Sequence, residues 1–251
     1  MPKAAMPSTA PAPRFRAASA SGAAAARAAL DLRAQVFRGG APDTDRFDAE
    51  ARHLTVQEVA TGRTAAACRV FLHADRAAAA RGYTGQFYGL RGLHMARAAP
   101  LLELGRFCIA PDLRADPDPP RLMLGRIAAL TLGSGAGMLL GCTSFPGADP
   151  ARHAAALGYL WRHHCAPAGQ GPAARAAETV ALARFAAAPG DDGAARAGVP
   201  PLLRSYLALG GWVSDHAVID RDLDTLHVFT ALAADRVPQA RRQSLRALAA
   251  V

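Results

Sequence analysis

The sequence predicts a single α/β domain built around a mixed β-sheet, and two observations support that prediction. Predicted elements follow one another as helix, strand, strand, strand, helix, strand, helix, strand, strand, an order typical of domains whose helices pack on one sheet. The 251 residues are also enough to bury a sizeable core, and no internal repeat divides them.

The first part of the domain is expected to be a helix followed by a hairpin. The alanine-rich segment 23–40 favours a helix that runs to about Phe37 and stops at Gly39 and Gly40. Two strand-like runs come next and are joined by Thr-Gly-Arg at 61–63. Glycine in such a short connection is typical of a turn between antiparallel strands.

The rest of the domain is expected to continue the sheet and to add helices. Proline and glycine residues mark the ends of these elements. The expected strands are 101–110, 139–145, 212–220 and 225–233, and the expected helices are 121–132, 149–164 and 200–210. The intervening segment 166–198 is rich in alanine, glycine and proline, which indicates an insertion.

Both ends of the chain are expected to lie outside this domain. Residues 1–26 are rich in alanine and proline and predict a disordered tail, without the apolar core of a secretion signal. Residues 239–251 form a short, basic, amphipathic tail. The uncharged stretch 127–148 is interrupted by four glycines between 133 and 141 and ends in Pro146 and Gly147, which indicates helix, turn and buried strand rather than a membrane span.

Charge and cysteine content restrict the partners and the compartment. The net charge of +9 favours acidic partners, namely nucleic acid, anionic lipid, phosphates or an acidic protein. A nucleic-acid-binding module is the less favoured alternative, because aromatic residues make up 6% and no recognition motif is present. The four cysteines show no paired spacing, which predicts free thiols in the cytoplasm and no metal site.

The stretch LLELGRFCIAPDLR, residues 101–114, places polar residues in an apolar strand. Gly105 indicates a β-bulge, which frees backbone N–H groups for a ligand. Burial of Glu103 in apolar surroundings penalises its charged form and suits a general base. The alternative is a salt bridge with Arg106 or another arginine at a sheet edge.

Two further places in the sequence are candidates for ligand binding. Arg114 and Arg121 flank a proline-rich loop before a helix, where a phosphate can bind, although a solvated loop is the alternative. Ser144 and Asp149 follow a buried strand, at the end where open α/β sheets bind ligands. The sequence around Ser144 has no nucleophile elbow, and the histidine spacing fits no metal site.

Taken in order, several segments resemble the bacterial L-ornithine N-alpha-acyltransferases, a GNAT-like family related to acyl-homoserine-lactone synthases. The segments are 32–37, 45–56, 102–114, 141–157, 163–167 and 200–232. The resemblance implies a GNAT-like acyltransferase domain over 27–238, with a mixed, mostly antiparallel sheet flanked by helices. It also implies transfer of a 3-hydroxyacyl group from acyl carrier protein to the α-amino group of L-ornithine, which gives lyso-ornithine lipid.

The resemblance assigns roles to the candidate residues. Glu103 is expected to act as the base, with Arg106 beside it, while the bulged strand donates N–H groups to the oxyanion. The acidic residues Asp45, Asp48 and Glu50 are expected to hold the cationic side chain of ornithine, unless they belong to a solvated loop. No bound cofactor is expected, since the donor is the 4′-phosphopantetheine thioester of the carrier protein.

One departure concerns the donor site. Coenzyme A-dependent GNAT proteins have a glycine-rich loop at the phosphates, and here the stretch is RADPDPPR, residues 114–121, without glycine. The absence of a glycine-rich loop fits acyl carrier protein as the donor. Arg114, Arg121 and Arg126 are expected to contact that acidic partner. The basic tail predicts peripheral contact with an anionic membrane. A homoserine-lactone-type synthase with another amine donor is the neighbouring alternative.

Overall fold

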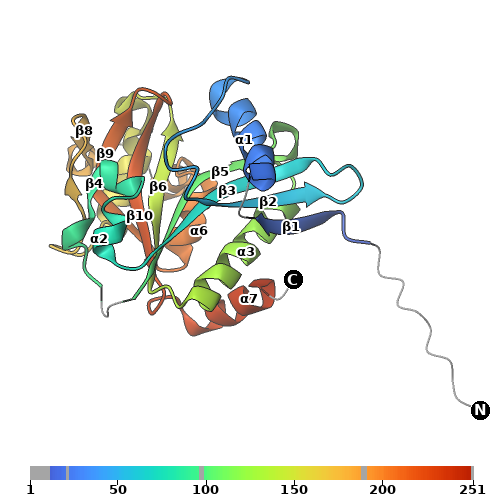
Figure 1. Cartoon of the computed structure of the whole chain (residues 1–251). Helices are drawn as coiled ribbons and strands as arrows, with labels where there is room; N and C mark the ends of the chain where they lie inside the picture. Colours follow the sequence, from blue (N-terminus) through green and yellow to red (C-terminus); the bar gives the residue numbers. More distant parts are fainter. Residues whose placement is uncertain (1–11, 21–22, 96–98, 188–190, 250–251) are drawn as a thin grey trace, which may run out of the picture.

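An eight-stranded sheet forms the centre of the computed structural model, which describes residues 12–20, 23–95, 99–187 and 191–249 (Figure 1). Within the described residues, β5 and β6 are parallel and all other neighbours in this sheet are antiparallel. The strands in spatial order are β1 (Phe15–Ala20), β2 (Arg52–Glu58), β3 (Thr64–His73), β5 (Leu101–Ile109), β6 (Met138–Pro146), β10 (Thr225–Ala233), β9 (Trp212–Asp220) and β8 (Thr179–Ala181). The expectation of a mixed, mostly antiparallel sheet flanked by helices is confirmed.

Helices pack on the sheet and short helical turns connect its strands. In Figure 1, α3 and α7 lie side by side beneath the sheet, and α1 contacts β2, β3 and β5. The α-helices are α1 (Ala23–Arg38), α2 (Arg76–Ala79), α3 (Asp118–Ser134), α4 (Ala154–His164), α5 (Asp192–Ala197), α6 (Pro201–Ala208) and α7 (Gln239–Ala249). The 3₁₀ turns are η1 (Thr84–Gln86), η2 (Leu90–Gly92), η3 (Pro111–Leu113), η4 (Pro150–His153) and η5 (Leu182–Phe185).

The hairpin and the uncharged stretch form as their sequences predict. Strands β2 and β3 are antiparallel, and Gly62 between them has a φ of +73°, a left-handed conformation that glycine adopts without strain. In the stretch 127–148, α3 ends at Ser134, Gly135 provides a left-handed cap, and β6 begins at Met138. Among the described residues, no helix combines the length and the apolar character needed to cross a membrane.

Two expected segments are more ordered than their compositions indicate. Residues 15–20 of the expected tail form β1, because Phe15 is buried in the core and the backbone pairs with β2. Residues 1–11 and 21–22 lie outside the described residues. The alanine-rich segment 166–198 supplies β8 to the edge of the sheet, and its β7 (Ala173–Ala174) pairs with β4 (Tyr88–Gly89). Composition missed both, since short edge strands form through tertiary pairing rather than propensity.

The C-terminal tail is also a packed element. The described part of 239–251 is helix α7, which contacts α3. Arg242 donates from Nε to the carbonyl oxygen of Val237 at 2.7 Å, which fixes the start of the helix. Residues 250–251 lie outside the described residues.

Strands β5 and β6 separate halfway along their length. Leu101–Leu104 pair with Met138–Gly141, but no pairing continues although the strands run on to Ile109 and Pro146. From this point β6 remains paired with β10. The result is a V-shaped opening in the middle of the sheet.

A β-bulge lies on β5 at the start of this opening. Ala67 faces Cys108 while Arg69 faces Gly105, so β5 contains one more residue than β3 in this interval. The expected bulge is therefore confirmed, but Arg106, with a φ of +52°, adopts the left-handed conformation, and Gly105 does not. Neither Arg106 nor Phe107 has a partner residue on β3.

Candidate active site

A cavity of about 1090 Å³ occupies the opening between β5 and β6. It reaches the bulge on one side and β6 and β10 on the other, with the start of α3 and helix α6 at its rim. Residues of all these elements contribute to its wall, among them Arg106, Phe107, Cys142, Tyr206 and His227. Its place and size make it the candidate active site.

Glu103 is buried and does not line this cavity. The side chain is 1% exposed, and its Oε2 lies 2.6 Å from Nε2 of His73. Its Oε1 accepts a hydrogen bond from the backbone N–H of Thr84, also at 2.6 Å. The expected alternative, a salt bridge with an arginine at a sheet edge, does not form. Strand β5 is central in the sheet, and the side chain that contacts Glu103 is His73. Sequence reasoning missed His73, which joins the site only through the β3–β5 pairing.

Arg106 faces the cavity and is held from two sides. Its Nε donates to Asp43 at 3.0 Å and its Nη1 donates to the hydroxyl of Tyr83 at 2.9 Å. Burial raises the pKa of Tyr83 although the charge of Arg106 opposes the shift, so the phenol is neutral at physiological pH. The guanidinium is therefore fixed in position at the bulge.

Four arginines and three aspartates form an ionic network beneath the bulge, in which Arg38 and Arg106 both contact Asp43, at 3.4 Å and 3.0 Å. Arg33 contacts Asp43 at 2.8 Å and Asp48 at 2.6 Å, while Arg69 contacts Asp45 at 2.6 Å and Asp48 at 2.8 Å. Burial opposes ionisation of Asp48, but hydrogen bonds, first of all from Arg33, lower its pKa to about 2. The negative charges of the network are thus compensated within the protein.

This network changes the interpretation of the acidic segment. Asp45 and Asp48 have arginine partners, which accounts for them without a bound ornithine. Glu50 is exposed and does not line the cavity. The segment is therefore neither a plain solvated loop nor a set of free carboxylates.

The remaining predicted residues divide between the cavity and the surface. Ser144 is exposed and lines the cavity, whereas Asp149 caps η4 by accepting the N–H of Ala151 at 3.0 Å. Arg114 and Arg121 line the rim at the start of α3. Arg126 instead donates to the hydroxyl of Ser19 on β1 at 3.0 Å and is not part of the cavity wall.

The structure adds polar residues to the wall that sequence reasoning missed, among them Asp220, Asp224, Thr225 and His227. They lie at the end of β9, in the turn that follows it and at the start of β10. Thr225 and His227 alternate with apolar residues in one strand, a pattern that equally describes an ordinary strand with one polar face. These residues become part of a site only because the cavity between β5 and β6 extends to this face of β10.

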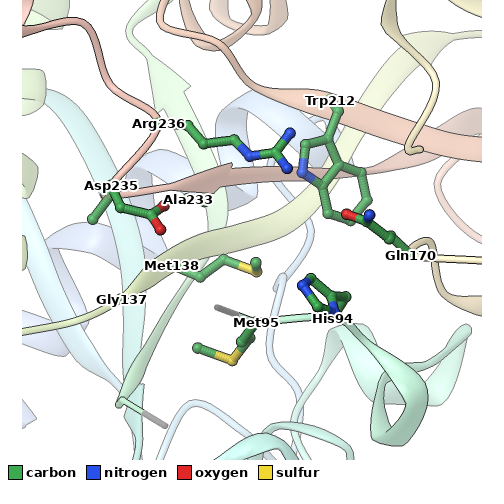
Figure 2. A pocket seen from close by; sticks show the side chains of 10 residues that line it. His94, Met95, Gly137, Met138, Gln170, Trp212, Ala233, Asp235 and Arg236 are labelled. Carbon is green, nitrogen blue, oxygen red and sulfur yellow. The ribbon is translucent and has the colours of Figure 1, made fainter. Parts of the chain in front are cut away.

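A second, smaller cavity of about 60 Å³ lies at the opposite end of the sheet. Met138 at the start of β6 and Trp212 at the start of β9 line it, and Figure 2 shows their side chains together with those of Met95 and Arg236. The volume suffices for a few water molecules but not for an acyl donor. The larger cavity remains the candidate.

Comparison with known proteins identifies the family. Residues 32–123 match the acetyltransferase (GNAT) domain family. The L-ornithine N(alpha)-acyltransferase of Rhodobacter capsulatus is 35% identical over 208 residues, which cover 80% of this chain and 78% of the relative. That of Brucella abortus is 32% identical over 203 residues, 78% of this chain and 71% of the relative. Among solved structures, TofI in an apo form has a TM-score of 0.47 at 16% identity, with 93% of this chain and 98% of that chain covered.

The splayed parallel pair, the bulge and the matched domain define an acyltransferase of the GNAT fold, an enzyme that transfers an acyl group to an amine. The sequence identity of 32–35% to the two relatives above places the chain in one family within this class. The chain belongs to the L-ornithine N(alpha)-acyltransferase family. Membership in this family sets aside the alternative of a non-catalytic nucleic-acid-binding module.

Proposed function

We propose that the protein transfers a 3-hydroxyacyl group from acyl carrier protein to the α-amino group of L-ornithine, forming lyso-ornithine lipid in the first step of ornithine-lipid biosynthesis. The observation that carries this proposal is the charge distribution of the large cavity. Arg114 and Arg121 lie at the rim beside α3, while Asp220 lies on the β9 side. Such a cavity suits an anionic donor and a cationic acceptor that meet at the bulge.

The start of α3 favours a carrier protein over coenzyme A as the donor. Free N–H groups at a helix start bind pyrophosphate, but Pro119 and Pro120 have none. The N–H of Asp118 is used by a hydrogen bond to the carboxylate of Asp116 at 3.0 Å. A phosphate must therefore be bound by arginine side chains. That arrangement is adequate for the single phosphodiester of phosphopantetheine.

The bulge supplies the electrostatic part of the reaction. When an amine attacks a thioester carbonyl, the carbonyl oxygen gains negative charge, and N–H donors aimed at it lower the barrier. Arg106 and Phe107 lack partners on β3 and line the cavity, so their backbone N–H groups are the proposed donors. The Arg106 side chain adds a positive charge held in place by Asp43 and Tyr83.

The attacking ammonium must lose a proton, and Glu103 is the proposed acceptor. Its two oxygens already contact His73 and Thr84, and it does not line the cavity. Proton transfer would therefore pass through an intervening water, with His73 sharing the charge. The amide forms as the carbon–sulfur bond breaks, and the thiol leaves on the donor.

A product assay tests this function. The purified protein is incubated with 3-hydroxyacyl carrier protein and ornithine, and the lipid is identified by mass spectrometry. The expected product is an ornithine amide of the hydroxy acid, formed faster from the carrier protein than from the matching acyl coenzyme A. Absence of this product over a range of chain lengths would overturn the proposal, and equal use of both donors would overturn its donor part.

Contact with an anionic membrane is proposed for helix α7, since the product is a lipid. Arg241 on this helix is exposed, next to Arg242. Sedimentation of the protein with vesicles that contain phosphatidylglycerol tests the proposal. Binding should fall in vesicles of phosphatidylcholine alone and at high salt. Equal sedimentation with both vesicle types would contradict it.

A further inference from the structure

One wall of the large cavity carries polar groups to which the reaction steps above assign no role. Asp220 on β9 faces Thr225 on β10, and His227 lies two residues further along β10. Residues two apart in a strand point to the same face, so the three side chains share one side of the sheet. Ser144 on β6 faces His227 from the other neighbouring strand and also lines the cavity.

Asp220 presents a charge without an ionic partner. Its Oδ1 accepts the backbone N–H groups of Asp222 and Leu223, both at 3.1 Å, which closes the β9–β10 turn. In the described part of the chain, no arginine or histidine pairs with this carboxylate, in contrast to the aspartates of the ionic network. An unpaired carboxylate on a cavity wall attracts a cation.

The negative charge of Asp220 also acts on two side chains of the cavity wall, Tyr83 and Cys142. Burial is the main cause of the raised pKa of Tyr83, and the negative charge of Asp220 adds to it. The same two causes raise the pKa of the Cys142 thiol, to which the Glu103 carboxylate also contributes. Tyr83, Cys142 and Asp220 all line the same cavity, so a ligand held there is exposed to the charge of Asp220.

His227 presents a buried acceptor without a partner. The residue is 2% exposed, lines the cavity, and its Nε2 has no hydrogen-bond partner among the described residues. The hydroxyl of Tyr88 donates to the carbonyl oxygen of His227 at 2.9 Å, so its oxygen is left to accept the Nδ1 proton at 3.1 Å. In this tautomer Nε2 carries a lone pair.

The environment keeps this imidazole neutral. Burial first, and then the charges of His216 and Arg106, lower the pKa of His227 to about 4. The ring of Phe87 packs edge-on against it at 4.9 Å between centroids. A neutral acceptor held between aromatic rings is suited to receive an N–H donor from a ligand.

We infer that this wall is the acceptor subsite for a diamino acid, in which Asp220 binds the side-chain ammonium and His227 Nε2 accepts a hydrogen bond from the α-amine. This inference rests on the proposed function. Diagonal neighbours on antiparallel strands are about 7–8 Å apart, a span suited to the two nitrogens of a short basic amino acid. His227 is a positioning residue that aims the amine lone pair, and Asp220 determines specificity.

The test compares ornithine with norvaline, which has the same carbon chain but no terminal amine. The kcat/KM of each is measured at saturating 3-hydroxyacyl carrier protein for the wild type and for Asp220→Asn. Asparagine keeps the oxygen that closes the turn and removes only the charge. The matched control is Asp215→Asn, on the same strand but with an exposed side chain.

The wild type is expected to prefer ornithine, and Asp220→Asn to lose about 10- to 100-fold with ornithine and nothing with norvaline. Asp215→Asn should match the wild type. An unchanged preference for ornithine in Asp220→Asn overturns the specificity role while leaving the proposed function intact. A wild type that acylates neither amine overturns the proposed function itself.

His227→Asn separates the second contact. Asparagine keeps a donor for Tyr88 and lacks the Nε2 acceptor, so kcat should fall by a similar factor with both amines while KM for ornithine stays nearly constant. His227→Gln, whose amide reaches the Nε2 position, should recover part of the rate. Thermal unfolding checks that both variants fold. A loss confined to ornithine, or an unchanged kcat, would remove His227 from the subsite.

Discussion

Nε2 of His73 lies 2.6 Å from Oε2 of Glu103, a buried carboxylate that does not line the large cavity. The backbone N–H of Thr84 holds the other oxygen, so the carboxylate also fixes the loop that carries Tyr83 into the cavity wall. Glu103 therefore has two roles that can be measured apart, in proton transfer and in the position of this loop.

Replacement of Glu103 by Gln should lower kcat by about 100-fold or more, because the amide keeps the two contacts but cannot take a proton. The measurement is product formation at saturating donor and ornithine, with the midpoint of thermal unfolding as the control for folding. His73→Asn should lower kcat less than Glu103→Gln, since the carboxylate remains. An unchanged rate in Glu103→Gln would exclude this residue from the mechanism.

Arg33 should be essential for the stability of the region beneath the bulge. Its side chain is 1% exposed and contacts Asp43 and Asp48, so Arg33→Met leaves two buried carboxylates without one of their partners. We expect a loss of about 3–5 kcal/mol in the free energy of unfolding, measured with urea. Arg63→Met is the control, because the pair with Asp112 is exposed to solvent and its loss should change the free energy of unfolding far less. Equal losses in both variants would contradict this account.

The sequence predicts the fold well because its signals are local. The turn at 61–63, the glycine cap after α3 and strands β9 and β10, which are rich in β-branched and aromatic residues, each form where their own residues favour them. Strands β1 and β8 were missed for the opposite reason. They are short edge strands, with alanine prominent in β1 and only three residues in β8, and they form because a neighbouring strand offers backbone partners.

The site was harder to predict than the fold because its contacts are long-range. The sequence indicates that Glu103 and Arg106 share a bulged strand, but not that the first pairs with His73 and the second with Asp43. In the sequence Asp45 and Asp48 look like free carboxylates, because their partners are distant in the chain. Arg33 lies on a helix and Arg69 on a strand, and only the fold brings them into contact with these aspartates. Asp220 and His227 have no distinguishing pattern in the sequence, since only the separation of β5 from β6 opens the cavity that they line.

Stability should fall as the pH is lowered from about 6.5 towards 4. The pKa of His227 is lowered to about 4 by burial and then by the charges of His216 and Arg106, against 6.5 in the unfolded chain. Between these values the unfolded state binds more protons, so the contribution of His227 is complete above pH 6.5 and is lost as the pH falls through 4.

The size of this effect for His227 is about 3 kcal/mol. The free energy of unfolding, measured with urea between pH 4.5 and 7.5, should rise with pH in the wild type and less steeply in His227→Asn. A residual slope is expected from His53, whose pKa burial also lowers. Parallel curves for wild type and variant would contradict the assignment.

Arg114 and Arg121 should act on the donor and Arg126 should not, although all three are basic and lie close together in the sequence. The first two line the cavity rim, whereas Arg126 is turned towards Ser19 on β1. Because each exposed charge contributes about 0.2–1 kcal/mol to an ionic contact, the double variant Arg114→Ala/Arg121→Ala should raise KM for the acyl carrier protein by about 2- to 20-fold. Its kcat should change little, and the difference from wild type should shrink as salt is added.

The same assay on Arg126→Ala is the matched control, because it removes one charge of the same kind from the other side of α3. A KM that rises as much in Arg126→Ala as in the double variant would mean that the carrier protein is attracted by the overall positive charge of the chain rather than by the rim of the cavity.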